Sequence, residues 1–377
     1  MKFLIITHVQ HKTNNGKIYG YGPYIKEMNL WLKYVDEVQV VGPMIDKIVD
    51  PIDLAYEHEN LSFVSTADFN ITSVKEMFKT FLKLPLLWFQ IIKAMVWAEH
   101  IHLRCPGNMG LLGSFAQIFF PYKMKTAKYA GNWDPDSKQP WSYNVQKWIL
   151  SNTFLTKNMK VLVYGEWPGQ SKNVVPFFTA SYSFTEVSSL KFLVSSEEPK
   201  TKNLLYVGAL SSNKRPLLSI QTTHKLIKEG IDVHLDLFGE GAEREVLEAY
   251  IEEHKLEKYV VLHGNQNADV VKEYFQKAHF LIFISKSEGW PKVVAEAMFW
   301  GCLPITTNVS CVNYMIGNGE RGKITEPNVE NIVKKVKYYL ENTAEFEQSS
   351  KHAMEWSQQF TLEKFEEEIG KLLNENK

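Results

Sequence analysis

The chain has little of what marks a membrane-spanning or disulfide-bonded protein. Its 377 residues include three cysteines, Cys105, Cys302 and Cys311, which share no C-x-x-C or metal-ligand spacing. We therefore expect reduced thiols in a cytoplasmic protein. No run of about 18 apolar, uncharged residues occurs, which predicts no membrane span. The apolar start, residues 1–10, is too soon interrupted by polar residues for a signal peptide, so we expect a first strand there.

The chain also lacks an excess of charge of one sign. It has 42 Lys and Arg against 43 Asp and Glu, a net charge of -1, which argues against a nucleic-acid partner. Hydrophobic residues make up 45% and charged residues 23%, as in soluble globular proteins. A length of 377 residues exceeds one ordinary core and predicts two domains.

The most informative segment is residues 280–301, FLIFISKSEGWPKVVAEAMFWG. An apolar run predicts a buried strand, a short polar turn follows, and an apolar-periodic helix ends at Gly301. Glu288 lies on the turn and Glu296 about one turn into the helix. The free N–H groups at a helix start bind anions. Two carboxylates beside an anion site suit a ligand with phosphates and vicinal hydroxyls, such as a nucleotide sugar.

This Glu-x7-Glu pattern, with E-A-M before a glycine, resembles the donor-site signature of retaining family-4 (group 1) glycosyltransferases of the GT-B fold. The resemblance implies that Glu288 approaches the transferred sugar and that Glu296 holds the ribose hydroxyls. The plain alternative is a strand–turn–helix with two solvated carboxylates. In the family, the residues between the two Glu line the donor site, and those other than proline donate backbone N–H groups to it. The expected donor-binding residues here are Gly289, Trp290, Pro291, Lys292 and Val293.

Residues 203–210 predict a strand that ends at Gly208, and residues 216–229 a helix. Lys214 and Arg215 therefore lie on a loop beside a helix start, where cations reach a diphosphate. The family usually has an Arg directly after this glycine, where this chain has Ala209. Either Arg215 supplies that charge, or the site uses more backbone donors.

Two further blocks follow in the order that the resemblance requires. Residues 233–238 predict a strand before a loop that starts at Gly239, and residues 260–264 a strand before a polar loop that starts at Asn265. In the family, this second loop lies against the base and contacts it mostly through backbone groups. The sequence therefore leaves the donor open between UDP- and GDP-linked sugars.

The N-terminal half also alternates strands with helices, which predicts a parallel sheet. The resemblance implies an α/β protein of the GT-B class, with two Rossmann-like domains that face each other across a cleft. We expect an N-terminal acceptor domain at 1–190, a donor domain at 191–355, a linker within 185–201, and a final helix, 356–377, that crosses back. The expected N-terminal strands are 2–7, 37–41, 61–65, 99–103, 126–129 and 161–164.

Four N-terminal loops at the strand ends are expected to line the cleft: 8–23, 104–110, 131–136 and 165–170. Gly20 and Gly22 resemble the family's glycine-rich loop, which approaches the donor diphosphate. Arg104 follows a strand end. Related enzymes often carry a His near 130–134, where this chain has none, so Asn132 and Asp134 are the polar candidates for sugar or acceptor contacts.

The resemblance implies transfer of a hexose from a nucleotide diphosphate sugar to a glycan or lipid-linked glycan, as in surface polysaccharide or glycolipid assembly. Glu288 and Lys214 would be the catalytic residues. The leaving diphosphate would accept the acceptor's proton, so no cofactor and no metal are expected. The alternatives are a catalytically silent nucleotide-sugar-binding partner protein and a nucleotide-sugar epimerase of the same fold.

Residues 75–128 are basic and rich in aromatic side chains, with eight Lys and Arg against Glu76 and Glu99. Such a surface suits peripheral contact with an anionic membrane, here the inner face of the cell membrane. Equally, the aromatic residues could fill the core while the lysines are merely solvated.

Overall fold

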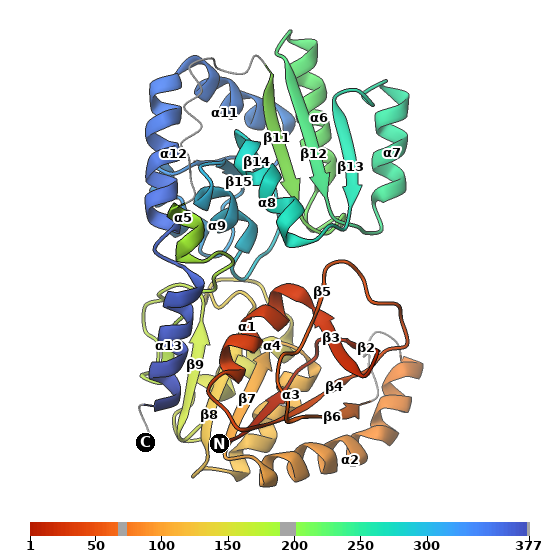
Figure 1. Ribbon diagram of the computed structural model, residues 1–377, viewed down its shortest axis with the longest axis vertical. Coiled ribbons are helices and arrows are strands. Elements are labelled where there is room, and N and C mark those ends of the chain that lie inside the picture. Colours follow the sequence, from red (N-terminus) through yellow and green to blue (C-terminus); the bar gives the residue numbers. More distant parts are fainter. Residues whose placement is uncertain (67–73, 189–200, 375–377) are drawn as a thin grey trace. The chain divides into compact units, whose positions relative to one another are not determined.

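The computed structural model describes residues 1–66, 74–188 and 201–374, and of residues 74–83 the backbone alone (Figure 1). The chain forms two compact units, Met1–Phe178 with Glu366–Lys377, and Thr179–Phe365. Each unit is built on a parallel sheet with crossover helices, so the expected pair of Rossmann-like domains is confirmed. Most of the linker expected at 185–201 lies outside the described residues.

The first unit contains a seven-stranded parallel sheet in the order β10-β9-β8-β7-β1-β4-β6. Its strands are β1 (Lys2–Ile6), β4 (Glu37–Pro43), β6 (Leu61–Thr66), β7 (His100–Cys105), β8 (Met124–Tyr129), β9 (Met159–Val163) and β10 (Val174–Pro176). Its helices are α1 (Gly22–Leu32), α2 (Val74–Trp97), α3 (Asn108–Ala116), η1 (Gln117–Phe119), α4 (Trp141–Ser151) and the end of α13 (Leu362–Asn374). The chain builds outward from β1 on one side and from β7 on the other.

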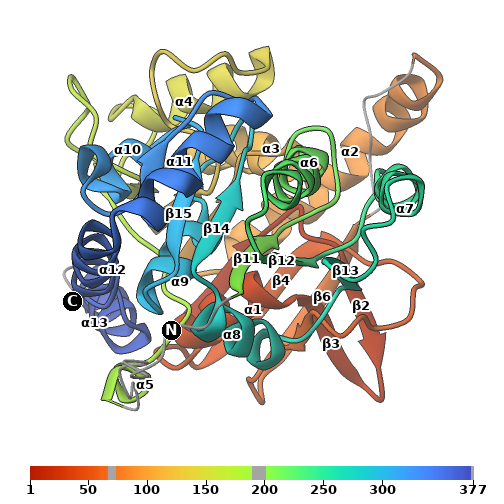
Figure 2. The same ribbon diagram turned by 90° about the horizontal axis from the view of Figure 1, so that it is seen from above.

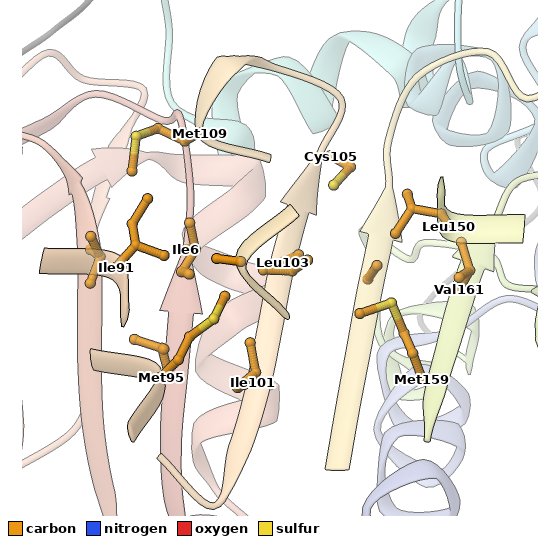
Figure 3. Packing of buried hydrophobic residues seen from close by; sticks show 14 of the residues in the cluster. Ile6, Ile91, Met95, Ile101, Leu103, Cys105, Met109, Leu150, Met159 and Val161 are labelled. Atoms are coloured by element: carbon orange, nitrogen blue, oxygen red, sulfur yellow. The ribbon is translucent and has the colours of Figure 1, made fainter. Parts of the chain in front are cut away.

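One face of this sheet is covered by α2, α3 and α4. Branched and sulfur-containing side chains from the three helices interdigitate with the strand residues, and none of them is more than 6% exposed (Figure 3). Burial of this apolar layer supplies the main driving force for the unit. The contributing residues include Ile91 and Met95 of α2, Met109 of α3, Leu150 of α4, and Ile6, Ile101, Leu103 and Val161 of the strands.

The α13 helix contacts the residues that directly follow α1. Lys33 Nζ lies 2.7 Å from Glu366 Oε2, and Gly370 lies against the ring of Tyr34.

The prediction of a loop at residues 8–23 is wrong over most of that range. It forms a hairpin of β2 (His11–Asn14) and β3 (Lys17–Tyr21), which β5 (Asp53–Ala55) extends to a third strand. The turn is Asn15–Gly16 with φ of 48° and 74°, the Asn-Gly pattern that closes two-residue hairpins. Gly20 therefore lies in a strand, not in a flexible glycine-rich loop.

Gly22 has a packing role at the start of α1. Its N–H donates to the Ile52 carbonyl at 3.0 Å, and a Cβ would lie 2.2 Å from that oxygen. Only glycine fits there. Contact of Gly20 and Gly22 with a diphosphate stays a prediction.

The second unit contains a six-stranded parallel sheet in the order β13-β12-β11-β14-β15-β16, whose first five strands Figure 2 shows side by side. Its strands are β11 (Lys202–Val207), β12 (Val233–Phe238), β13 (Val260–Gly264), β14 (Phe280–Phe283), β15 (Leu303–Thr306) and β16 (Lys323–Ile324). Its helices are α5 (Phe184–Ser188), α6 (Pro216–Lys228), α7 (Arg244–Glu253), α8 (Ala268–Lys277), α9 (Lys292–Phe299), α10 (Val312–Met315), η2 (Gly317–Gly319), α11 (Val329–Glu341) and α12 (Thr343–Ser357).

Three buried histidines make the first unit sensitive to acid. His100 Nε2 and His102 Nδ1 each lie 2.9 Å from the Thr126 hydroxyl, and His11 Nε2 lies 3.1 Å from the Tyr56 hydroxyl. Burial lowers the pKa of His100 to about 3 and that of His11 to about 4, and it also lowers the pKa of His102. These rings are therefore neutral in the folded protein at pH 7.

The unfolded chain binds protons at these histidines below pH about 6.5, whereas in the folded chain His100 and His11 stay neutral until about pH 3 and about pH 4. We therefore expect the free energy of unfolding to fall as the pH is lowered from 6.5 to 5. His100→Gln, which keeps a hydrogen-bonding group for Thr126, should reduce that slope by about 1.4 kcal/mol per pH unit. Urea unfolding at each pH measures it, with His352→Gln on α12 as the control. A variant slope equal to that of the wild type would refute the prediction.

Candidate functional site

The candidate site lies at the carboxyl edge of the second sheet. From β11 the chain adds β12 and β13 on one side and then β14 and β15 on the other, so the loops after β11 and β14 diverge. Ligands of doubly wound sheets bind at this kind of switch point. Here the two loops are joined, because the Lys286 N–H donates to the Asn213 carbonyl at 2.8 Å and the Asn213 side-chain amide donates to the Ser287 carbonyl at 3.2 Å.

The structure brings Lys214 and Glu288 together at this point. Lys214 Nζ forms an ion pair with Glu288 Oε1, and the Ser285 hydroxyl donates to the same oxygen. The Lys214 side chain is 21% exposed and that of Glu288 is 11% exposed, so solvent screens the pair only partly. The Lys214 ammonium also lies 4.9 Å from the centre of the Phe283 ring. Glu288 is thus a held carboxylate, not a solvated loop residue.

The turn that carries Glu288 is supported by the loop after β15. The Thr307 hydroxyl donates to the Ser285 carbonyl at 2.5 Å, and the Ser310 hydroxyl donates to the Gly289 carbonyl at 2.7 Å. Sequence reasoning missed Ser285, Thr307 and Ser310. A run of hydroxyl residues directly after two buried strands was the available signal.

The α9 helix begins beside this turn without a side-chain cap. Pro291 occupies the N-cap position, and the first turn contains no acidic residue. The Lys292 N–H donates to the Trp290 carbonyl at 2.9 Å. An uncapped helix start of this kind is suited to an anion. The expected anion-binding segment, Gly289 to Val293, therefore lies next to the Lys214–Glu288 pair.

Glu296 faces different surroundings from Glu288. Its Oε1 accepts a hydrogen bond from the Ser181 hydroxyl at 2.5 Å, and it lines a pocket together with Tyr182 and Lys292. Burial, and then the charge of Glu296, raise the pKa of Tyr182. The other pocket residues are Thr179, Ala180, Trp290, Ala295, Phe299, Ser357 and Phe360.

Trp290 packs its side chain into an aromatic cluster at this pocket. Its ring centre lies 6.3 Å from the centres of both Trp356 and Phe360, and the side chain is 8% exposed. The aromatic residue of the turn therefore anchors the start of α9 to the end of α12. That leaves its backbone, not its ring, to face a ligand.

Glycines close the ends of three neighbouring strands. The Gly208 N–H donates to the Phe238 carbonyl and the Gly239 N–H to the Gly264 carbonyl, both at 2.9 Å. Gly239 has φ 133°, and a Cβ there would lie 2.0 Å from the Gly208 oxygen. The close approach of the loops thus accounts for Gly239 without a ligand. The donor roles of Gly208, Gly239 and Asn265, which directly follows Gly264, stay predictions.

Arg215 adopts the left-handed conformation, with φ 50°, at the N-cap of α6. In the part of the chain that the structure describes, its partly exposed guanidinium forms no ion pair or hydrogen bond. At the position of the missing family Arg, the Ala209 carbonyl accepts a hydrogen bond from the Tyr206 hydroxyl at 2.8 Å. Arg215 therefore stays a candidate for a diphosphate contact.

The candidates of the first unit already have structural partners. Arg104 Nη1 lies 3.9 Å from Glu27 Oε2, and its guanidinium lies over the Tyr24 ring. Asn132 Oδ1 accepts a hydrogen bond from the Asp134 N–H at 3.0 Å, and Asp134 Oδ1 accepts one from the Asp136 N–H at 2.9 Å. These contacts stabilise local turns, and acceptor or sugar contacts at Arg104, Asn132 and Asp134 stay predictions.

Neither a metal site nor a membrane-spanning helix is found among the described residues. No group of three or more His, Cys, Asp or Glu side chains there could hold a metal ion, and no helix there is long and apolar enough to cross a membrane. The three cysteines are free and buried, and burial raises the pKa of Cys105 to about 12.

Most of the second unit is similar in sequence to known glycosyltransferases. Residues 191–358 match the family model of glycosyl transferases group 1. An uncharacterized glycosyltransferase of Methanocaldococcus jannaschii is 29% identical over 161 residues, which are 42% of this chain and 44% of that protein. The Campylobacter jejuni N-acetylgalactosamine-N,N'-diacetylbacillosaminyl-diphospho-undecaprenol 4-alpha-N-acetylgalactosaminyltransferase is 32% identical over 133 residues, 35% of each chain. The chain thus spans less than half the length of the curated relatives it matches.

Solved structures extend the similarity to the fold of the whole chain. Anabaena HepE, crystallised with UDP and glucose, has a TM-score of 0.70 at 14% identity and is covered over 100% of both chains. The expected group 1 family is confirmed for residues 191–358, which are less than half of the chain, and the expected GT-B fold is confirmed. Identity this low carries the fold alone.

The contact between Ser181 and Glu296 allows a graded test of the expected ribose site. Glu296→Ala should weaken nucleoside diphosphate binding by about 1.5–3 kcal/mol, the scale of a charge-assisted hydrogen bond. Ser181→Ala keeps the carboxylate but frees its rotamer, so we expect a smaller loss, about 0.5–1.5 kcal/mol. Isothermal titration with UDP and GDP measures both.

Ser350→Ala is the matched control, because that hydroxyl bonds the Gly301 carbonyl at the other end of α9. Unchanged affinity in Glu296→Ala would remove Glu296 from the ribose site.

Proposed function

We propose that this chain, a group 1 glycosyl transferase over residues 191–358, moves a sugar from a nucleotide diphosphate sugar to a glycan or lipid-linked glycan acceptor. The observation that carries the proposal is the Lys214–Glu288 pair at the switch point of the second sheet. A cation, a held carboxylate and an uncapped helix start lie together there, as a sugar diphosphate requires.

On this proposal each group takes one part of the donor. The start of α9, Lys214 and Arg215 bind the diphosphate, and Glu296 binds the ribose. Glu288 contacts the transferred sugar. Lys214 Nζ can donate to a phosphate oxygen while it stays next to Glu288, because an ammonium has three donors. The Lys214–Glu288 pair then contacts both the diphosphate leaving group and the transferred sugar.

We infer a retaining reaction without metal or cofactor. Attack on the face from which the diphosphate departs lets the leaving phosphate accept the acceptor's proton. The protein then positions the two substrates and stabilises the charge that develops on the diphosphate. Lys214, Arg215 and the N–H groups of α9 provide that positive potential.

The similar proteins suggest which substrates to test first. HepE was crystallised with UDP and glucose, which favours UDP over GDP as the first donor base. The Campylobacter relative is named for a diphospho-undecaprenol acceptor, which favours a polyprenyl diphosphate-linked glycan. These names support our proposal of a role in surface polysaccharide or glycolipid assembly, in the cytoplasm or at the inner face of the cell membrane.

Glu288→Gln tests the catalytic role of the pair. We expect turnover to fall by about 100-fold or more, because a contact that orients the reacting sugar contributes most in the transition state. Affinity for the nucleoside diphosphate should hold or rise slightly, since the substitution leaves the Lys214 charge without its anion. Turnover is measured as sugar transfer from the UDP- or GDP-linked donor, chosen by which nucleoside diphosphate raises the melting temperature of the protein. Affinity is measured by isothermal titration with that nucleoside diphosphate.

Glu326→Gln, an exposed carboxylate after β16 of the same sheet, is the control. A Glu288→Gln enzyme with the full transfer rate would refute the assignment. A wild-type protein that binds the nucleotide without releasing or transferring sugar would favour the silent binding protein.

A further inference from the structure

The outer side of the helix layer α2–α4 exposes large apolar side chains. On the described part of α2, Leu86, Phe89 and Val96 recur at helical spacing and are all more than 60% exposed. The opposite side of the same helix contributes Ile91 and Met95 to the core. The second half of α2 is therefore apolar on both faces, which a helix covered on one side alone does not require.

The exposed surface continues from α2 onto the neighbouring loops. The Phe119 ring lies 6.4 Å from that of Trp88, and Lys123 Nζ donates to the Val96 carbonyl at 2.7 Å. Beyond them, the Asn158 side chain donates to the Pro121 carbonyl at 3.0 Å. Phe119, Tyr122 and Phe154 are 70%, 85% and 89% exposed. We call Leu86, Phe89, Val96, Phe119, Tyr122 and Phe154 the outer apolar face.

This clustering contrasts with the second unit. The large apolar side chains that the described part of that unit exposes are scattered over separate elements. Single exposed hydrophobic residues of that kind are ordinary, whereas a contiguous set marks an interaction surface. The scattered residues are Phe184, Val246, Tyr259, Tyr314 and Tyr338.

The outer apolar face lies in the most basic part of the chain. Residues 74–160 contain twelve Lys and Arg against four Asp and Glu, although the whole chain has a net charge of -1. Lys93 is exposed on α2, four residues from Phe89, and Lys157 is exposed with its ammonium 5.2 Å from the centre of the Tyr122 ring. The side chains of residues 74–83, which include Lys75, Lys79 and Lys83, lie outside the described part.

Apolar and aromatic side chains next to lysines match an anionic lipid surface. The rings enter the boundary between headgroups and acyl chains, and the ammonium groups pair with lipid phosphates. A second copy of this chain would bring two basic surfaces face to face, which like charges oppose. We therefore propose that the outer apolar face docks the protein on an anionic lipid leaflet.

Within the first unit, this face lies apart from the predicted acceptor-side residues Arg104 and Asn132. Val96, Tyr122 and Phe154 lie a few residues before the starts of β7, β8 and β9, at the amino edge of the first sheet. Arg104 lies near the carboxyl end of β7, and Asn132 follows the carboxyl end of β8. Docking through the amino edge leaves the carboxyl edge uncovered by lipid, so changes to the face should not alter donor binding.

Vesicle flotation tests this proposal without sugar transfer. Wild-type protein should float with phosphatidylcholine vesicles that contain about one third phosphatidylglycerol, and not with phosphatidylcholine alone. We expect Phe89→Ser combined with Phe119→Ser, and Lys93→Glu combined with Lys157→Glu, each to reduce binding about tenfold or more. Val246→Ser, an exposed apolar residue of α7, is the control and should bind as the wild type does.

Each variant's melting temperature, with and without nucleoside diphosphate, verifies that it is folded. Wild-type protein that fails to bind anionic vesicles would overturn the proposal, and so would full binding by the charge-reversed variant. A concentration-dependent dimer that the Phe89→Ser, Phe119→Ser protein no longer forms would assign the face to a second copy instead. None of these outcomes depends on the role of Glu288.

Discussion

The ion pair between Lys214 and Glu288 is the constraint on which the site depends. A carboxylate that is 11% exposed needs a cation and hydrogen-bond donors, because desolvation of an unpaired charge is costly. Lys214 and Ser285 supply them from two loops that lie 70 or so residues apart in the chain and meet at the switch point. Asn213, Thr307 and Ser310 then hold those loops in register. The pair and its supports make a preorganised charged corner beside an uncapped helix start.

That corner and the Glu296 pocket divide the donor-binding task between two environments. Glu288 is compensated by a cation, whereas Glu296 accepts a hydrogen bond from a neutral hydroxyl and forms no ion pair among the described residues. A compensated carboxylate can lie near a diphosphate without strong repulsion. An uncompensated one is the better acceptor for ribose hydroxyls. The two Glu of one motif are thus suited to different parts of one ligand.

Much of the fold and some of the site followed from the sequence, for identifiable reasons. Strands 233–238 and 260–264 coincide with β12 and β13, because buried parallel strands are short apolar runs between turn residues. The β2–β3 hairpin was not predicted, because Gly20 and Gly22 resembled a ligand-binding loop. The Asn15–Gly16 pair was the signal for a hairpin turn. The Ser181–Glu296 contact could not be predicted, since it joins residues 115 positions apart through one hydroxyl. Side-chain partners of that kind depend on tertiary packing and leave no local pattern.

The central claim is that a nucleoside diphosphate binds at the switch point of the second sheet. Amide hydrogen exchange with and without UDP or GDP tests it most directly, because it reports on every loop at once. The account predicts slower exchange in residues 208–215 and 285–296 when the nucleotide is bound, with the distant α7 and α11 helices unchanged. Protection confined to other loops, with 285–296 exchanging at the rate of the free protein, would contradict it.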